Sequence, residues 1–178
     1  MSIVGAVIVP HPPLLLPEVG KGREAKIHAT MEAMRRAAEQ VARWEPEVLI
    51  VASPHTILYA DYFHIAPGSR AFGSMAVFQA PQVRLEARYD VSLREAIIEE
   101  AQSVSLPAGT LGQRDSELDH GILVPLYFLR KAGVNCPIVR MGLSGLSALD
   151  HYRLGQCVAR AVDRLVRSLL PAAICRIN

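Results

Sequence analysis

The sequence predicts a single α/β domain with a largely parallel sheet and helices on both faces of that sheet. Short, β-branched apolar runs alternate with longer amphipathic segments through most of the 178 residues. The runs lack the polar alternation of half-exposed strands, so we expect strands that are buried on both faces. Alternating strands and helices favour parallel pairing, because parallel strands need a long crossover connection. No internal repeat or low-complexity linker divides the chain.

The first half of the chain supplies two of the expected strands. The apolar run over residues 2–9 predicts a central strand that is buried on both faces. A proline-rich loop follows it and holds His11 just beyond the carboxyl end of that strand. A long helix is expected over residues 21–44, since its apolar residues recur at helical spacing. The second buried strand is expected over residues 48–52, and His55 follows its end.

The middle of the chain is less regular. Residues 59–66 and 83–89 alternate well enough to predict two further strands. Between them, residues 68–73 are rich in glycine and polar residues and are expected to form a turn or an excursion over the active face. Asp90 is a plausible N-cap for a helix over residues 91–103.

The last third of the chain continues the alternation. A short strand is expected over residues 108–111, and a compact helix should follow residues 118–121 and end at Gly133. A further strand is expected over residues 137–143.

A capping box, Ser147 with Asp150, should start the final helix over residues 148–170. Residues 172–178 then begin like another strand and stop. We therefore expect residues 1–178 to form one domain that is shortened at its C-terminus.

Composition excludes several function classes. A net charge of +2 without any basic run argues against nucleic acid as a partner. No apolar stretch approaches the roughly 20 residues that a membrane-spanning helix needs, and the N-terminus does not resemble a signal peptide. Cys136, Cys157 and Cys175 form no CxxC pair, so we expect reduced thiols in a cytoplasmic protein.

Two histidines are the candidate metal ligands. His11 and His55 each follow an apolar strand closely and are each flanked by proline. Ligands of open α/β sheets gather at the carboxyl ends of the strands, and neutral imidazole is the commonest metal ligand. Either histidine alone could be a loop residue that is hydrogen-bonded to nearby backbone. As a pair at equivalent strand ends, they favour a divalent metal site.

A third histidine, His120, is the candidate catalytic residue. It lies at the start of a helix, where it could act as a general acid or base toward a bound hydroxyl group. Alternatively, it could simply cap the start of that helix. Asp119 could cap that helix or orient an imidazole, and Gly121 would let backbone approach a ligand closely. We therefore assign Asp119 and Gly121 to the substrate-binding region.

Other candidate sites are weaker. The remaining histidines, at positions 28, 64 and 151, are expected to be exposed or packed without a catalytic role. The sequence has no GxSxG elbow, and the glycines after residue 141 lack the lysine and spacing of a P-loop. Nucleophilic and phosphate-binding functions are therefore disfavoured.

Taken in order along the chain, these short motifs resemble the class III extradiol ring-cleavage dioxygenase superfamily. The resemblance is to the LigB-type catalytic subunits, especially members that occur with the AmmeMemoRadiSam proteins, and it is more distant to Memo. It covers nearly the whole chain. The motifs are Ile8 to Pro13, Ser53-Pro54-His55, Phe72-Gly73, Ala80 to Val83, Leu118 to Gly121 and Val124-Pro125-Leu126.

The resemblance implies a function. The histidines matching His11 and His55 bind non-haem iron(II), or zinc or another divalent metal, and the one matching His120 lines the substrate pocket. The reaction is cleavage of a small aromatic diol with O2. A facial site with two histidines and one carboxylate leaves positions for both substrates.

The sequence departs from the family pattern at the third metal ligand. The family supplies a carboxylate and a further histidine from a C-terminal stretch that this sequence does not contain. Glu18 and Asp119 are weak substitutes. Two alternatives therefore stay open: a Memo-like metal-binding or accessory protein without ring cleavage, and an inactive fragment whose open sheet edge drives homo-oligomerisation.

Overall fold

The computed structural model describes residues 3–112 and 117–169, and for residues 166–169 it describes the backbone alone. The strand expected over residues 172–178, and Cys175 with it, lies outside the described residues. Five α-helices are present in the described part: α1 (Pro17–Gly20), α2 (His28–Arg43), α3 (Val91–Ser103), α4 (His120–Lys131) and α5 (Ala148–Leu169). The strands are β1 (Leu49–Ser53), β2 (Phe63–His64), β3 (Arg70–Met75), β4 (Ala80–Arg88), β5 (Ala108–Gly109) and β6 (Ile138–Gly142). Short 3-10 helices cover Pro13–Leu15, Arg23–Ile27 and Ala76–Phe78.

Parallel pairing dominates the centre of the molecule, as the sequence predicts. Strand β1 pairs with β6 in parallel, from Leu49 opposite Ile138 to Ser53 opposite Gly142. Strands β2 and β5 form a second parallel pair, and an antiparallel bridge between Ile65 and Met141 connects β2 to β6. The exception is the antiparallel pair of β3 and β4. The predicted α/β class is confirmed.

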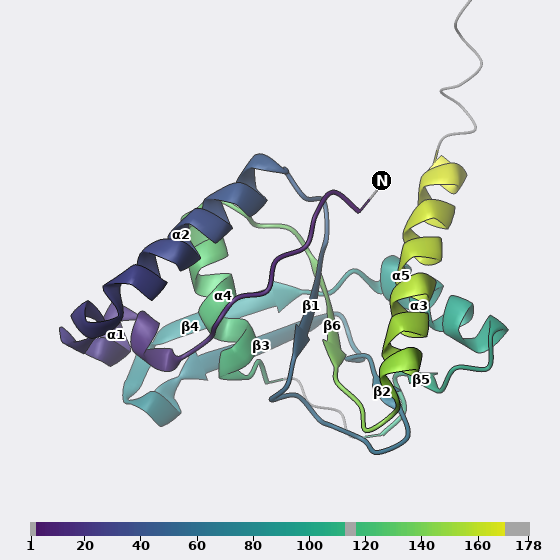
Figure 1. Cartoon of the computed structure of the whole chain (residues 1–178), viewed down its shortest axis with the longest axis horizontal. Coiled ribbons are helices and arrows are strands. Elements are labelled where there is room, and N and C mark those ends of the chain that lie inside the picture. Colours follow the sequence, from purple (N-terminus) through teal and green to yellow (C-terminus); the bar gives the residue numbers. More distant parts are fainter. Residues whose placement is uncertain (1–2, 113–116, 170–178) are drawn as a thin grey trace, which may run out of the picture.

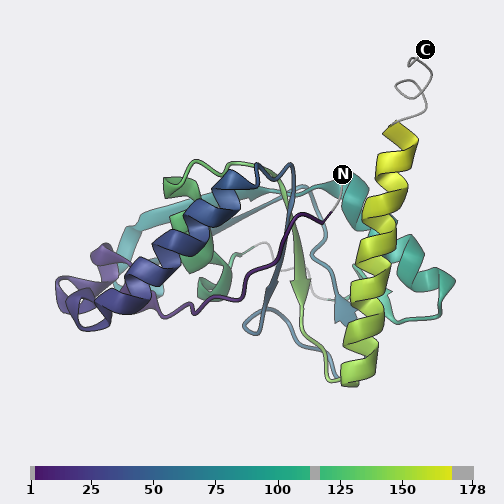
Figure 2. The same cartoon turned by 45° about the horizontal axis from the view of Figure 1, so that its top comes forward.

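Strand β6 is the central element, because both of its faces are covered. Ile138 packs into a core cluster with α2, α4 and the β3–β4 hairpin. Val139 and Met141 point the other way, into a cluster with α3 and α5. Figures 1 and 2 show α2 and α4 on one side of the β1–β6 pair and α3 and α5 on the other. Helices therefore lie on both faces of the β1–β6 pair, which is one of three two-stranded sheets among the described residues.

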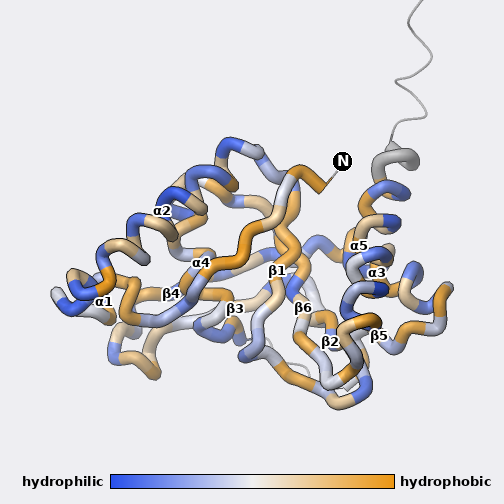
Figure 3. The backbone as a smooth tube through the Cα atoms, viewed as in Figure 1, coloured by the Kyte–Doolittle hydropathy of each residue, from blue (hydrophilic) through white to orange (hydrophobic). Residues whose placement is uncertain are grey.

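Helical periodicity explains which side of each helix is buried. In α2, the buried residues are Met31, Met34, Ala38 and Val41, which recur every three or four positions. Helix α3 starts where expected, because Asp90 accepts a hydrogen bond from the backbone N–H of Leu93 at 2.8 Å. Ser147 likewise accepts from the N–H of Asp150 at 3.1 Å before α5. Figure 3 shows hydrophilic and hydrophobic residues alternating along these helices.

The N-terminal apolar run is not the buried strand that its composition predicts. Residues 3–9 are extended, and within the described part of the chain no backbone hydrogen bond pairs them with a neighbour. Ile8 is fully exposed, and the run crosses beside β1 as an apolar trace (Figure 3). Gly5 lies against Trp44, and Val9 packs against the core. A strand needs a backbone partner, and no described segment provides one.

Strand β1 is also less buried than expected. Leu49 and Val51 pack against the core, whereas Ile50 and Ala52 on the opposite face are exposed. Burial of an apolar run therefore depends on what covers it and not on the run alone.

Other differences follow from backbone pairing and local conformation. A turn is expected over residues 68–73, but residues 70–73 belong to β3, because that strand pairs with β4 from Arg70 opposite Arg88. The expected strand over residues 59–66 is reduced to β2 and isolated bridges. The long helix predicted from residue 21 begins at His28, because Lys21 is left-handed at φ 50° and a 3-10 turn follows. Among residues 3–112 and 117–169, no helix is both long and apolar enough to span a bilayer.

Candidate metal centre

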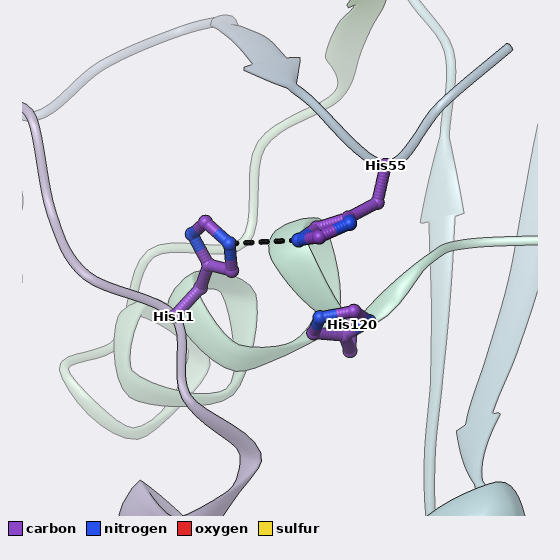
Figure 4. Close-up of side chains that lie close together, drawn as sticks. All are labelled: His11, His55 and His120. Atoms are coloured by element: carbon purple, nitrogen blue, oxygen red, sulfur yellow. Dashed lines mark hydrogen bonds between the residues drawn. The ribbon is translucent and has the colours of Figure 1, made fainter.

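Three histidines that are distant in sequence meet at one point of the fold. The side chains of His11, His55 and His120 face one another (Figure 4), and one imidazole nitrogen of each lies within 4.8 Å of the others. His11 Nε2 and His55 Nε2 are 2.9 Å apart, close enough for one ring to donate a hydrogen bond to the other. The rings of His55 and His120 have centroids 4.1 Å apart.

Each histidine is held by a different element. His11 precedes the turn Pro13–Leu15, and the buried residues Leu15 and Leu16 anchor that turn in the core. His55 follows the end of β1 by two residues, and His120 is the first residue of α4. The structure thus brings together all three histidines that the sequence singles out.

The spacing of the nitrogens fits a metal ligand set. Two imidazole nitrogens bound to one ion at about 2.0–2.1 Å lie roughly 2.9 Å apart at a right angle and roughly 3.4 Å apart at a tetrahedral angle. The 2.9 Å between His11 and His55 lies at the lower end of that range. One ring nitrogen of His120 lies within 4.8 Å of a nitrogen of each of the other two histidines. The residues present therefore fit a divalent metal.

Electrostatics favour neutral imidazole at the third position. Burial lowers the pKa of His120, and the neighbouring rings of His55 and His11 lower it further, while the Asp119 carboxylate opposes them. A neutral imidazole has a lone pair that can bind a metal or accept a proton. His120 is therefore suited to either role.

Asp119 does not cap α4, although it lies at the N-cap position. The side chain of Asp119 makes no capping hydrogen bond; instead, its Oδ1 accepts one from the Ser53 hydroxyl at 2.7 Å. Gly121 lies against Ser53 and His55: a Cβ at position 121 would be 2.4 Å from Ser53 Oγ and 3.0 Å from His55 Cδ2. The region around Gly121 is thus filled by protein atoms. A role of either residue in substrate binding remains a prediction.

No carboxylate joins the histidine cluster within the described residues. The other carboxylate considered from sequence, Glu18, accepts hydrogen bonds from the hydroxyl of Tyr127 at 3.0 and 3.1 Å. Asp119 is likewise committed to Ser53. Asp119 Oδ2 is buried without a hydrogen-bond partner in the described part of the chain and lies 4.0 Å from Arg140 Nη2. Among the described residues, the cluster itself therefore consists of three nitrogen ligands.

One residue of the site was not found from the sequence. The ring of Phe78 contacts His120 edge to face, with centroids 5.3 Å apart. Phe78 also lines a cavity of about 400 Å³ together with Val19, Lys21, Arg23, Val77 and Gln79. It lies in a 3-10 turn between β3 and β4, where no local motif marks it as a site residue.

The remaining histidines lie apart from the cluster. His64 is buried, and its Nδ1 lies 3.1 Å from the carbonyl oxygen of Leu111. His28 is exposed and lies 3.7 Å from Glu32. His151 packs edge to face on Phe63 and is partly exposed.

Comparisons with known proteins agree with this geometry. Residues 5–170 match the family described as the catalytic LigB subunit of aromatic ring-opening dioxygenase. The chain is 34% identical over 172 residues to Protein CA_C1420 of Clostridium acetobutylicum, covering 93% of this chain and 37% of that protein. It is 26% identical over 77 residues to a 4,5-DOPA dioxygenase extradiol-like protein of Schizosaccharomyces pombe, covering 43% of this chain and 26% of that protein.

The chain therefore covers little more than a third of the length of the Clostridium acetobutylicum protein and about a quarter of the Schizosaccharomyces pombe protein. The family match, in contrast, runs through nearly the whole chain and includes His11, His55 and His120. The chain belongs to the LigB family of aromatic ring-opening dioxygenase catalytic subunits.

Proposed function

We propose that His11 and His55 bind a divalent metal, iron(II) in the first instance, and that this site serves extradiol cleavage of a catechol-like ring with O2. The observation that carries the proposal is the convergence of three imidazoles from three separate elements within 4.8 Å. Family membership supports dioxygenase chemistry. Because the chain covers only part of the two relatives, the activity of the whole protein is itself part of this proposal.

The roles of the residues follow from their positions. A bound iron(II) would supply a Lewis acid that lowers the pKa of a substrate hydroxyl and a redox centre for O2. His120, next to both proposed ligands and favoured as the neutral imidazole, would accept a proton from that hydroxyl. Phe78, which contacts His120 edge to face, would offer an aromatic ring to a planar substrate bound next to His120.

The absence of a carboxylate from the described cluster favours a second candidate. A site of three imidazoles is typical of zinc, and iron(II) dioxygenases use two histidines and one carboxylate. In this second candidate, His120 is the third ligand. The protein then binds a divalent metal as a Memo-like or accessory protein, without ring cleavage.

Anaerobic titration of iron(II) into the protein tests the metal site. We expect one equivalent to bind, and we expect the variant His11→Ala/His55→Ala to lose binding. The exposed His28 provides the matched control, since His28→Ala removes an imidazole far from the cluster. Equal uptake by the wild type and the double variant contradicts the site.

Oxygen consumption separates the two candidates. The iron-loaded protein is mixed with a panel of catechols, and O2 is measured together with the ring-opened product. Ring cleavage that is lost in His120→Ala supports the dioxygenase. Tight metal binding without oxygen consumption for any catechol supports the accessory protein.

A further inference from the structure

A buried hydrogen bond joins the two elements that present His55 and His120. Ser53 is the last residue of β1 and Asp119 immediately precedes α4. Ser53 Oγ donates to Asp119 Oδ1 at 2.7 Å, although 66 positions separate the two residues in sequence. Each partner is within two positions of a histidine of the cluster, so this one contact bears on the relative placement of both rings.

The same hydroxyl also acts on the backbone of His55. Ser53 Oγ accepts a hydrogen bond from the His55 N–H at 3.1 Å. A continuous path therefore runs from the His55 backbone through the Ser53 hydroxyl to the Asp119 carboxylate. Ser53 is only 1% exposed, so water does not compete for its hydrogen bonds.

Strand β6 holds the carboxylate from the other side. Arg140 lies opposite Val51 in the β1–β6 pair, and its Nη2 is 4.0 Å from Asp119 Oδ2. The side chains are 3% and 13% exposed respectively, so the opposite charges interact with little solvent screening. Ser53 thus fixes Asp119 Oδ1 by a hydrogen bond, whereas Oδ2 has no hydrogen-bond partner among the described residues and is near the guanidinium only through charge attraction.

Gly121 provides a separate indication that this contact is tightly fitted. A Cβ at that position would lie 2.4 Å from Ser53 Oγ and 2.9 Å from Asp119 Oδ1. The first turn of α4 can approach β1 this closely only because residue 121 has no side chain.

We propose that Ser53 and Asp119 are positioning residues whose hydrogen bond holds His55 and His120 at the spacing that a shared metal requires. This inference rests on the metal site proposed above. Neither residue is a ligand in this scheme. Loss of hydrogen-bonded residues around metal ligands typically lowers metal affinity about 10- to 100-fold.

The test uses cobalt(II) as the probe, because its visible absorption reports ligand geometry as well as affinity. We expect Ser53→Ala to weaken cobalt(II) binding about 10- to 100-fold and to change the absorption bands. Ser53→Thr, which keeps the hydroxyl, should restore both. The surface pair of Ser147 and Asp150 has the same 2.7 Å separation, so Ser147→Ala is a matched control that should bind as the wild type does.

A double-mutant cycle with Asp119→Asn shows whether the two residues act through their mutual contact. If they do, the losses of the single variants are not additive, and the double variant is little weaker than the worse single one. Additive losses overturn the proposal. So does unchanged cobalt(II) binding in Ser53→Ala, or a Ser53→Thr variant as weak as Ser53→Ala.

A metal-free measurement distinguishes failure of this inference from failure of the metal site. The imidazole carbon-bound proton signals are recorded by NMR in the wild type and in Ser53→Ala, both in the presence of a chelator. The signals of His55 and His120 should shift while that of His28 stays in place. If the wild type takes up no cobalt(II), the proposed function fails, and the positioning role is decided by these signals alone: unchanged signals overturn it.

Discussion

The hydroxyl of Tyr127 donates to the carboxylate of Glu18, with 3.0 and 3.1 Å to its two oxygens. This contact joins helix α1 to helix α4, the helix that begins with His120. Burial raises the pKa of Tyr127, Lys131 opposes this shift, and the Glu18 carboxylate adds to it, so the hydroxyl stays protonated and able to donate. Glu18 is thereby held as a structural acceptor next to α4.

Removing this hydroxyl should destabilise the domain without removing a metal ligand. We expect Tyr127→Phe to lower the free energy of unfolding by about 1.5–3 kcal/mol, the usual range for a hydrogen bond to a charged group. Urea denaturation measures the change. The matched control is Tyr152→Phe, because Tyr152 is largely exposed on α5. Equal stability of the two variants would show that the Glu18 contact contributes nothing.

Metal binding should raise the thermal stability of the domain. A ligand that binds only the folded state adds about 2.7 kcal/mol at a concentration of 100 times its dissociation constant. For a chain of this length, the melting temperature should rise by roughly 5–11 °C. Differential scanning calorimetry with and without zinc(II) measures the shift. A similar shift in His11→Ala/His55→Ala would place the stabilising ion elsewhere.

The metal-free protein should lose stability as the pH falls. The pKa of His120 is lowered in the folded state from its ordinary 6.5. Between the two values the unfolded chain binds more protons than the folded one, so the free energy of unfolding decreases as the pH falls through that window. Above the unfolded pKa this loss is absent. Urea denaturation with a chelator at several pH values should give a shallower slope for His120→Asn than for the wild type. Parallel slopes would contradict the prediction.

Phe78 should affect a bound aromatic ring more than the metal. Edge-to-face aromatic pairs contribute about 0.5–1.5 kcal/mol beyond the area that they bury, which is roughly a 2- to 12-fold change in affinity. We expect Phe78→Ala to weaken binding of 4-nitrocatechol to the metal-loaded protein by that factor, with metal affinity unchanged. Absorption titration measures the affinity for 4-nitrocatechol. Phe72→Ala, at an exposed phenylalanine on β3, is the control and should bind as the wild type does.

The exposed apolar residues of segment 3–9 and of the neighbouring strand β1 should promote self-association. Ile8 and Ile50 are both exposed, and residues 3–9 carry no backbone pairing within the described part of the chain. Exposed apolar surface and unpaired extended backbone both favour contacts with a second chain. We expect Ile8→Ser/Ile50→Ser to reduce concentration-dependent association in light scattering. Val77→Ser replaces an exposed valine elsewhere and should leave association unchanged.

Much of the fold was predictable from local signals. The N-terminus of α3 follows from Asp90, and α5 follows from Ser147. The burial expected for the N-terminal apolar run, residues 2–9, is wrong for residues 3–8, which are exposed, because burial depends on neighbouring segments that composition does not reveal. Strand β3 was missed for a related reason, since glycine and serine are poor strand formers and only pairing with β4 makes the segment extended.

Some features of the site could likewise be predicted from the sequence, and others could not. The sequence singled out His11, His55 and His120, which do converge, but only His55 follows a strand of the described chain. His11 follows a segment without backbone pairing among the described residues, and His120 begins α4, so the expected pair of strand ends is not what brings these residues together. The link between Ser53 and Asp119 and the contact of Phe78 with His120 were not predictable. Both depend on side-chain distances between elements that are remote in sequence.

The wide separation of the three histidines has a consequence for how the protein would acquire its metal. His11 and His55 are 44 positions apart, and His120 follows 65 positions later. An unfolded chain would have to close two long loops to chelate an ion, and the entropy of loop closure opposes this. The closely spaced ligands of a zinc finger close shorter loops, so folding around the ion is less favourable for these three histidines. Metal uptake should follow folding, so the amount of metal that the protein binds would report how much of it is already folded.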